Sequence, residues 1–403
     1  MELFWLEHKK LWRKKIVKIC VLLCFVYCVI FGSILSFQWF SFGSSDDYTS
    51  AFGNNFDGYT VIKDSQEYAL SFGGELTDET LQQIVSDYQQ MEADGMEKEL
   101  EKTDWQIVNS WLGTLYPELR DTSNYKTMIS YVDPDKLTGF YERRQQVLDE
   151  FLEISGQVGA EKEYLHQIER KVEKPFHYEW VEGWSTLLGS TVADLGVVMA
   201  LFLGIVLSSL FAGEWHDNTS ALVLTTRNGW GKIALAKILT GLAFTVELFA
   251  LLAVSSVISQ LFFMGTAGWD MPIQNIKLIA AAPMNMLQAE IYEYAFVLLG
   301  AIGFAGIVMF ISAAVKNNVL TLLLSLAVVY GPMMIAEYLP YEMQKALDLI
   351  PLVGSSTDIF RTNTFRIFGK LIWSPYLLIT IPVLIGILCM PFAIKSWSRR
   401  MKA

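Results

Sequence analysis

The chain has 403 residues, of which 52% are hydrophobic, and a formal net charge of −11. Its mean hydropathy of +0.33 excludes an ordinary soluble protein and calls for a search for membrane spans first. The charge is unevenly divided: residues 44–183 hold 29 acidic and 12 basic residues, so the rest of the chain is net basic. We expect no nucleic-acid partner, because so acidic a segment repels phosphates.

Residues 1–15 mix aromatic and leucine side chains with lysines and an arginine. This pattern is typical of an amphipathic helix that lies on the cytoplasmic membrane interface, with membrane lipids as its partners. A frayed basic tail is the alternative.

Residues 16–40 are predicted to form the first transmembrane helix, with its apolar run at 17–40. The run is too long for a cleaved signal peptide, and no small-residue cleavage site follows it, so we expect a retained helix. Cys20, Cys24 and Cys28 recur every fourth residue and share one face. We interpret them as residues for packing or lipid contact and expect no metal site, because thiolates inside lipid are costly and no histidine accompanies them.

Residues 41–186 form a domain-sized acidic insert that we expect to be extracellular and mostly helical. Residues 59–70 could form a short strand pair, and Leu81, Ile84 and Tyr88 make an apolar helical stripe. Asp133 before Pro134 predicts the start of a helix that runs to about residue 155. The insert lacks cysteine, which fits the cell envelope of a Gram-positive bacterium.

Five further apolar runs are long enough to cross a membrane, which gives six predicted transmembrane helices with the first one. The runs are 190–211, 233–263, 294–315, 319–338 and 374–394. Lysine and arginine beside the spans place both termini in the cytoplasm of a multi-pass plasma-membrane protein. The predicted fold class is therefore a mainly α polytopic membrane protein, with helices two to six in residues 187–403. Residues 339–372 should form interfacial or re-entrant helices at the outer surface.

A polar loop, residues 212–231, lies between the second and third predicted spans. Such a loop can hold one small helix that docks into a groove on a cytoplasmic partner. The residues expected to take part are Glu214, Trp215, His216, Asp217, Asn218, Thr219, Leu222, Leu224 and Arg227. The alternative is a solvated loop whose basic residues serve membrane topology alone.

The chain here resembles permease subunits of type-2 ATP-binding-cassette (ABC) exporters, especially the Firmicute form with a large outer insert between the first two helices. The residues that carry the resemblance are Glu214, Thr219, Leu222, Leu224, Thr225, Arg227, Gly229, Ala236 and Lys237. Asn218 stands where the family usually has glycine. The resemblance implies a coupling helix seated on a cytosolic ABC ATPase dimer and a second permease subunit, identical or homologous. It also implies a hydrophobic or amphipathic cargo, such as an antimicrobial peptide or a lipid-linked compound, exported for immunity or resistance.

We expect no catalytic residues and no cofactor on this chain. A phosphate-binding loop needs G-x-x-x-x-G-K-[ST], but Thr226 stands at the first glycine position and Ile233 at the hydroxyl position. ATP and Mg²⁺ would therefore bind the partner ATPase. The four histidines are scattered along the chain, and no hydrolase motif accompanies them.

Glu247 falls near the middle of the third predicted span and is the candidate residue of an intramembrane pathway. The alternative is a neutral acid that is hydrogen-bonded inside the bundle. For the whole chain, export of a cargo is the first hypothesis. The second is an ATP-driven sensor or mechanotransmitter that binds an envelope ligand without transporting it, and the third is a receptor without an ATPase.

Overall fold

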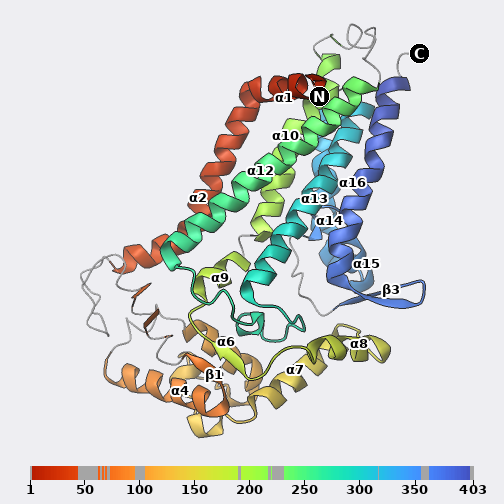
Figure 1. Cartoon of the computed structure of the whole chain (residues 1–403). Coiled ribbons are helices and arrows are strands. Elements are labelled where there is room, and N and C mark those ends of the chain that lie inside the picture. Colours follow the sequence, from red (N-terminus) through yellow and green to blue (C-terminus); the bar gives the residue numbers. More distant parts are fainter. Residues whose placement is uncertain are drawn as a thin grey trace.

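The computed structural model describes residues 2–43, 62–63, 66–67, 69, 73–95, 105–188, 192–216, 219, 231–315, 317–354 and 363–399. These residues are mainly helical. Long helices run side by side through most of the molecule (Figure 1). Helix α1 and the C-terminal end of α16 lie at one end of this bundle, and the insert domain, which we define as the described part of residues 62–186, lies at the other.

Five helices are long and apolar enough to cross a membrane, which supports the predicted helical membrane protein. They are α10 (Val192–His216), α12 (Lys232–Met264), α13 (Met286–Ala314), α14 (Asn318–Ile335) and α16 (Ser374–Arg399). Each corresponds to one of the predicted spans after the first. The first predicted span lies in helix α2 (Lys15–Gly43), whose side chains are described up to residue 30. A sixth span stays a prediction.

Helix α13 begins about two turns before the predicted start of its span at residue 294. Asn285 and Gln288 form a capping box, in which each side chain accepts a hydrogen bond from the other's backbone N–H. Hydropathy alone omitted these first turns because they contain Glu290 and Glu293, which are both buried in the structure.

Glycines allow helices α13 and α16 to pack closely along their lengths. A Cβ atom on Gly306 would overlap the backbone of Gly386, and one on Gly303 would overlap the backbone of Pro382. Small residues at such contacts let helices approach in a membrane, where packing replaces the hydrophobic effect. Helices α13 and α16 run side by side in the bundle (Figure 1).

The described part of the insert domain is mostly helical, as predicted. Its helices are α4 (Asp78–Ala93), α6 (Trp105–Leu115), η1 (Pro117–Leu119), η2 (Met128–Ser130), η3 (Pro134–Lys136), α7 (Phe140–Ile154), α8 (Ala160–Glu169) and α9 (Glu182–Thr186). Strands β1 (Gly74–Leu76) and β2 (Phe176–Tyr178) pair antiparallel, with Glu75 opposite His177. The predicted stripe of α4 is confirmed, since Leu81 and Ile84 are buried and Tyr88 packs against the same core.

The helix predicted from residue 134 to about 155 is interrupted. Asp133 does cap a helical turn, by accepting from the N–H of Asp135, but η3 ends at Lys136. Helix α7 starts afresh after Gly139, whose φ of 73° interrupts the helical path. The carboxylate of Asp78 then accepts hydrogen bonds from the N–H groups of Gly139 (2.6 Å) and Phe140 (2.9 Å). The sequence around Gly139 could not predict this cap, because Asp78 belongs to another helix, α4.

Two further local predictions differ from the structure, the first in its described residues and the second in part. In residues 59–70, where a strand pair was expected, the described residues 62–63, 66–67 and 69 are helical. In residues 339–372, a short helix is present, α15 (Tyr341–Leu347), after η6 (Ala336–Tyr338), but it is followed by a hairpin of β3 (Thr364–Ile367) and β4 (Lys370–Trp373). Phe368 and Gly369 at the turn both have positive φ, which matches the twist of a tight hairpin.

The segment between α12 and α13, residues 265–285, which we call the connector, attaches the insert domain to the bundle. It contains η5 (Ile273–Asn275). Trp111 donates to the carbonyl of Asn275 (2.8 Å), and the buried guanidinium of Arg144 donates to the carbonyls of Leu278 (2.7 Å) and Ala280 (3.1 Å). The side chain of Leu278 joins the core of the insert domain. The insert domain therefore meets the bundle through buried contacts.

Candidate functional site

The N-terminal helix α1 (Glu2–Arg13) is present as predicted, and it packs against α12. Its apolar side chain Leu11 is 2% exposed. The ring of Trp12 meets the ring of Phe244 edge-on, with centroids 5.8 Å apart. By contrast, Trp5 and Leu6 of the same helix are exposed. This division is what an amphipathic helix requires.

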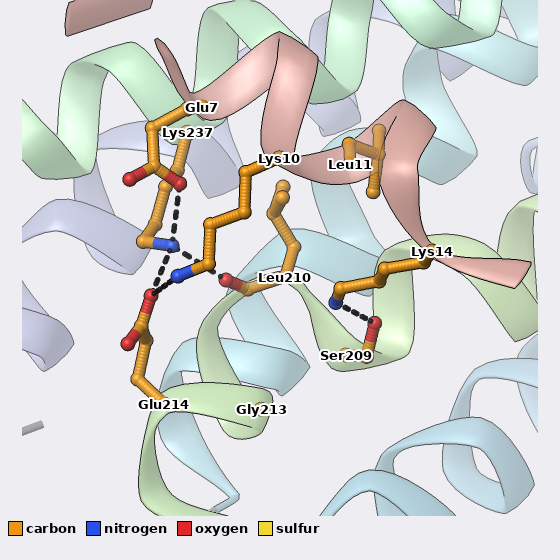
Figure 2. Close-up of a pocket in the computed structure, with 9 residues that line it drawn as sticks. All are labelled: Glu7, Lys10, Leu11, Lys14, Ser209, Leu210, Gly213, Glu214 and Lys237. Atoms are coloured by element: carbon orange, nitrogen blue, oxygen red, sulfur yellow. Dashed lines mark hydrogen bonds and ion pairs between the residues drawn. The ribbon is translucent and has the colours of Figure 1, made fainter. Parts of the chain in front are cut away.

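Four charged side chains meet where α1, the end of α10 and the start of α12 converge (Figure 2). We call this set the inner charge cluster; it consists of Glu7, Lys10, Glu214 and Lys237. The Lys237 side chain is 2% exposed, and its Nζ donates to Glu7 Oε2 (2.9 Å), Glu214 Oε1 (3.0 Å) and the carbonyl of Leu210 (3.0 Å). All three hydrogens of the ammonium group are thus satisfied.

Glu214 is the acidic centre of this cluster, with a side chain only 4% exposed. One carboxylate oxygen accepts from Lys237 and from Lys10 (2.6 Å). The other accepts from the hydroxyl of Thr219 (2.5 Å), whose N–H also bonds to the carbonyl of Glu214. Two acids and two cations balance the charge, and good hydrogen-bond geometry offsets the cost of burial.

The structure changes the role expected of Glu214. Helix α10 continues to His216, so Glu214, Trp215 and His216 form its last turn rather than the beginning of a loop at residue 212. The Glu214 carboxylate points into the protein, where it is unavailable to a docking partner (Figure 2). Trp215 packs its ring against Trp397 of α16, with centroids 6.2 Å apart.

The remaining positions of the expected coupling loop differ in what the structure shows of them. Thr219 is described, and it is held by Glu214. Five positions lie outside the described residues: Asp217, Asn218, Leu222, Leu224 and Arg227. Their part in a coupling helix therefore stays a prediction.

The inner charge cluster joins the two ends of the chain segment that follows α10. Glu214 lies just before residues 217–231, and Lys237 lies in the second turn of the helix that comes after them. The ion pair of Glu214 and Lys237 connects the two helices that flank this segment. Glu7 and Lys10 connect α1 to the same two residues. A displacement of the segment would therefore be passed to α1, α10 and α12 together.

Glu247 has partners that the sequence did not suggest. Its carboxylate accepts from Trp12 Nε1 (3.0 Å) and lies 3.2 Å from His8 Nε2, and its side chain is 43% exposed. Both partners belong to α1, more than two hundred residues away in the chain. Glu247 thus helps to hold α1 on α12. Its place in an intramembrane pathway stays a prediction.

Glu290 is a buried acid that sequence reasoning missed. It is 3% exposed on α13, one turn before Tyr294, whose hydroxyl is 2.9 Å from that of Ser256 on α12. In the described part of the chain no cation forms an ion pair with Glu290. A signal was available, since an extension of the predicted span by two turns would have placed this acid inside a helix. The cysteines Cys20, Cys24 and Cys28 are free and buried, as expected of packing residues.

The chain matches no protein-family model, no curated protein and no solved structure.

Proposed function

We propose that this chain is the membrane-spanning permease subunit of an ABC transporter, which couples ATP hydrolysis by a separate cytosolic ATPase to export of a hydrophobic or amphipathic cargo. The segment 217–231 would carry the helix that docks on the ATPase. ATP and Mg²⁺ would bind that partner, and a second permease subunit would complete the pathway. Both termini would be cytoplasmic and the insert domain extracellular.

The observation that carries this proposal is the ion pair of Glu214 with Lys237. A loop that serves topology alone needs no buried connection between its two flanking helices. Here the connection is nearly free of solvent and includes a third element, α1. A docked partner that moves the segment would act on all three elements as one body, and packed elements of this kind switch between discrete arrangements.

Two variants test separately whether segment 217–231 binds the ATPase and whether the buried ion pair passes a movement of that segment to the helices. The chain is purified in mild detergent, and co-purifying nucleotide-binding protein is quantified for the wild type and for a loop variant, D217K/R227E. We expect the wild type to retain the ATPase and the loop variant to lose most of it. The matched control E150K changes an exposed acid of the insert domain and should retain the partner.

A second variant addresses transmission. E214Q/K237M removes the charges of the buried pair while leaving residues 217–231 intact, so it should keep the ATPase bound but reduce the stimulation of ATP hydrolysis by cargo. The proposal fails if no nucleotide-binding protein accompanies the wild-type chain, or if the loop variant retains it in full.

A sensor that transports nothing is the second candidate, and the attachment of the insert domain to the connector favours it. Arg144 is fully buried, pairs with Glu169 (2.6 Å) and holds two carbonyls of the connector. A ligand on the insert domain could thus act on α12 and α13 without crossing the membrane. Reconstitution in liposomes distinguishes the two: ATP-dependent accumulation of labelled cargo supports export, and stimulated hydrolysis without accumulation supports the sensor.

A further inference from the structure

A pocket of about 350 Å³ lies between the insert domain and the connector. Its volume falls within the range of small-molecule sites, which often occur where two domains meet. One side consists of residues 171–177, at the start of β2, and the other of residues 270–288, which lead into α13. A ligand in this pocket would contact both the insert domain and the connector between α12 and α13.

The pocket is lined by both apolar and charged side chains. Phe176 and Val172 are buried, and Pro272 and Met284 complete the apolar lining from the connector. Glu173 and Asp270, one from each of the two lining segments, are exposed, and neither carboxylate forms an ion pair or hydrogen bond with a described residue.

Two cationic or titratable side chains also line the pocket, Lys171 and His177. With a neutral histidine, the charged side chains that line the pocket carry an excess of one negative charge. Lining residues 171–177 also belong to a segment, residues 44–183, with 29 acidic against 12 basic residues. The field of that segment raises the local concentration of cations and lowers that of anions.

Gln274 supplies a second, independent feature of the pocket lining. Its side chain is fully buried, and its Nε2 donates to the carbonyls of Ala280 (3.0 Å) and Ala282 (2.8 Å). Both amide hydrogens are used, which fixes the orientation of the group. Its Oε1 is left without a hydrogen-bond partner among the described residues. A buried acceptor of this kind costs free energy unless a donor reaches it.

We propose that this pocket binds an amphipathic cation, in which an ammonium or guanidinium group lies between Glu173 and Asp270 and an apolar body packs on Phe176 and Met284. An N–H donor of the same molecule would satisfy Gln274 Oε1. Binding itself depends only on the pocket. The further step, that such cations are the cargo or the sensed ligand, rests on the function proposed above.

The test uses dansylcadaverine, which joins an apolar ring system to a primary amine, and its N-acetylated analogue, which has the same body without the charge. Binding to the full-length chain in detergent is measured by equilibrium dialysis against empty micelles. We expect the amine to bind more tightly than the acetylated form. Its affinity should fall as salt is raised, since exposed charges are screened over about 10 Å at 0.1 M ionic strength.

The variant E173Q/D270N should weaken binding of the amine by roughly tenfold, because two carboxylates no longer attract it, and should leave binding of the acetylated probe unchanged. The control E150Q/D94N removes two exposed acids of the insert domain that do not line the pocket, and it should bind as the wild type does. Elution as a single size-exclusion peak verifies that each variant is folded.

Equal affinity of the wild type for the two probes, or equal affinity of E173Q/D270N and the wild type for the amine, would overturn the pocket proposal. The two proposals fail separately. An ATPase that co-purifies with a chain unable to bind the amine leaves the proposed function standing. Charge-dependent binding to a chain without any ATPase leaves the pocket standing.

Discussion

Lys237 shows how a single buried charge can hold three helices of this protein together. Its ammonium group is nearly excluded from water, and it survives there because two carboxylates and a carbonyl surround it. Removal of one partner of a buried ion pair costs about 3–5 kcal/mol, whereas removal of both is often nearly neutral. The pair of Lys237 and Glu214 therefore predicts a strongly non-additive pair of mutations.

We expect K237M to lower the thermal stability of the chain in detergent well below that of the wild type, because Glu7 and Glu214 lose their shared cation. The double variant E214Q/K237M should recover most of the loss. K232M is the matched control: Lys232 is exposed at the start of the same helix and forms no ion pair with a described residue. Additive losses in the double variant would contradict the buried pair.

A second residue-scale prediction concerns Glu169 of the insert domain. Burial alone would raise the pKa of this carboxyl, but the hydrogen bonds and charges of Lys174 and Arg144 outweigh burial and hold the pKa below its usual 4.5. A carboxyl whose pKa is lowered on folding stabilises the protein above the unfolded pKa. That contribution disappears as the pH falls from about the unfolded value of 4.5 through the lower folded pKa.

The variant E169Q should accordingly be less stable than the wild type at pH 7, and the difference should shrink as the pH is lowered below 4.5. Thermal unfolding between neutral and acid pH measures this difference. E150Q, at an exposed acid, should follow the wild type at every pH. A difference between E169Q and the wild type that does not change with pH would refute the assignment.

At the scale of elements, the close approach of α13 and α16 decides how the bundle is held together. Their glycines face the partner backbone, so contact depends on the absence of side chains rather than on their nature. Helix α12 has a different role. Its 33 residues extend about 50 Å, from the inner charge cluster to the connector that holds the insert domain.

We expect G306A to destabilise the protein, because the new Cβ would overlap the backbone of Gly386 and force the two helices apart. G331A makes the same change in α14, where a Cβ would meet nothing within 4 Å. There it should be neutral or stabilising by up to about 1 kcal/mol, since alanine favours a helix over glycine. Thermal unfolding in detergent measures both, and equal effects would argue against the close contact.

At the scale of the whole molecule, α12 runs from α1 at one end of the bundle to the connector at the other (Figure 1). At one end Lys237 holds α1 and α10, and at the other Arg144 holds the connector. The proposed docking segment and the proposed ligand pocket each border one of these contacts. This arrangement offers a continuous protein path between them, whether the chain exports a cargo or senses a ligand.

The contact between Arg144 and the connector can be tested by hydrogen exchange. R144L removes the donors to Leu278 and Ala280, so we expect faster exchange of backbone amides throughout the connector. R143L is the matched control in the same helix. Arg143 bonds to Glu118 and to carbonyls within the insert domain, so its loss should leave the connector protected. Unchanged exchange in R144L would show that the connector is held by other contacts.

The apolar runs determined that this is a helical membrane protein, because about twenty apolar residues can satisfy their backbone in lipid only as a helix. The apolar stripe of α4 and the amphipathic character of α1 could also be predicted from the sequence, because each depends only on residues close together in the chain. The start of α13 was misjudged because its first turns bear acids whose burial depends on neighbouring helices.

Only the tertiary structure decided which partners Glu214 and Glu247 have and which segments line the pocket. Glu214 was expected to face a partner, yet it is buried by Lys237 and Lys10. Glu247 pairs with α1, and the pocket brings together residues 171–177 and 270–288. Each depends on contacts between segments distant in the chain. Hydropathy and spacing report what a residue is, but its environment is set by whatever the rest of the fold places beside it.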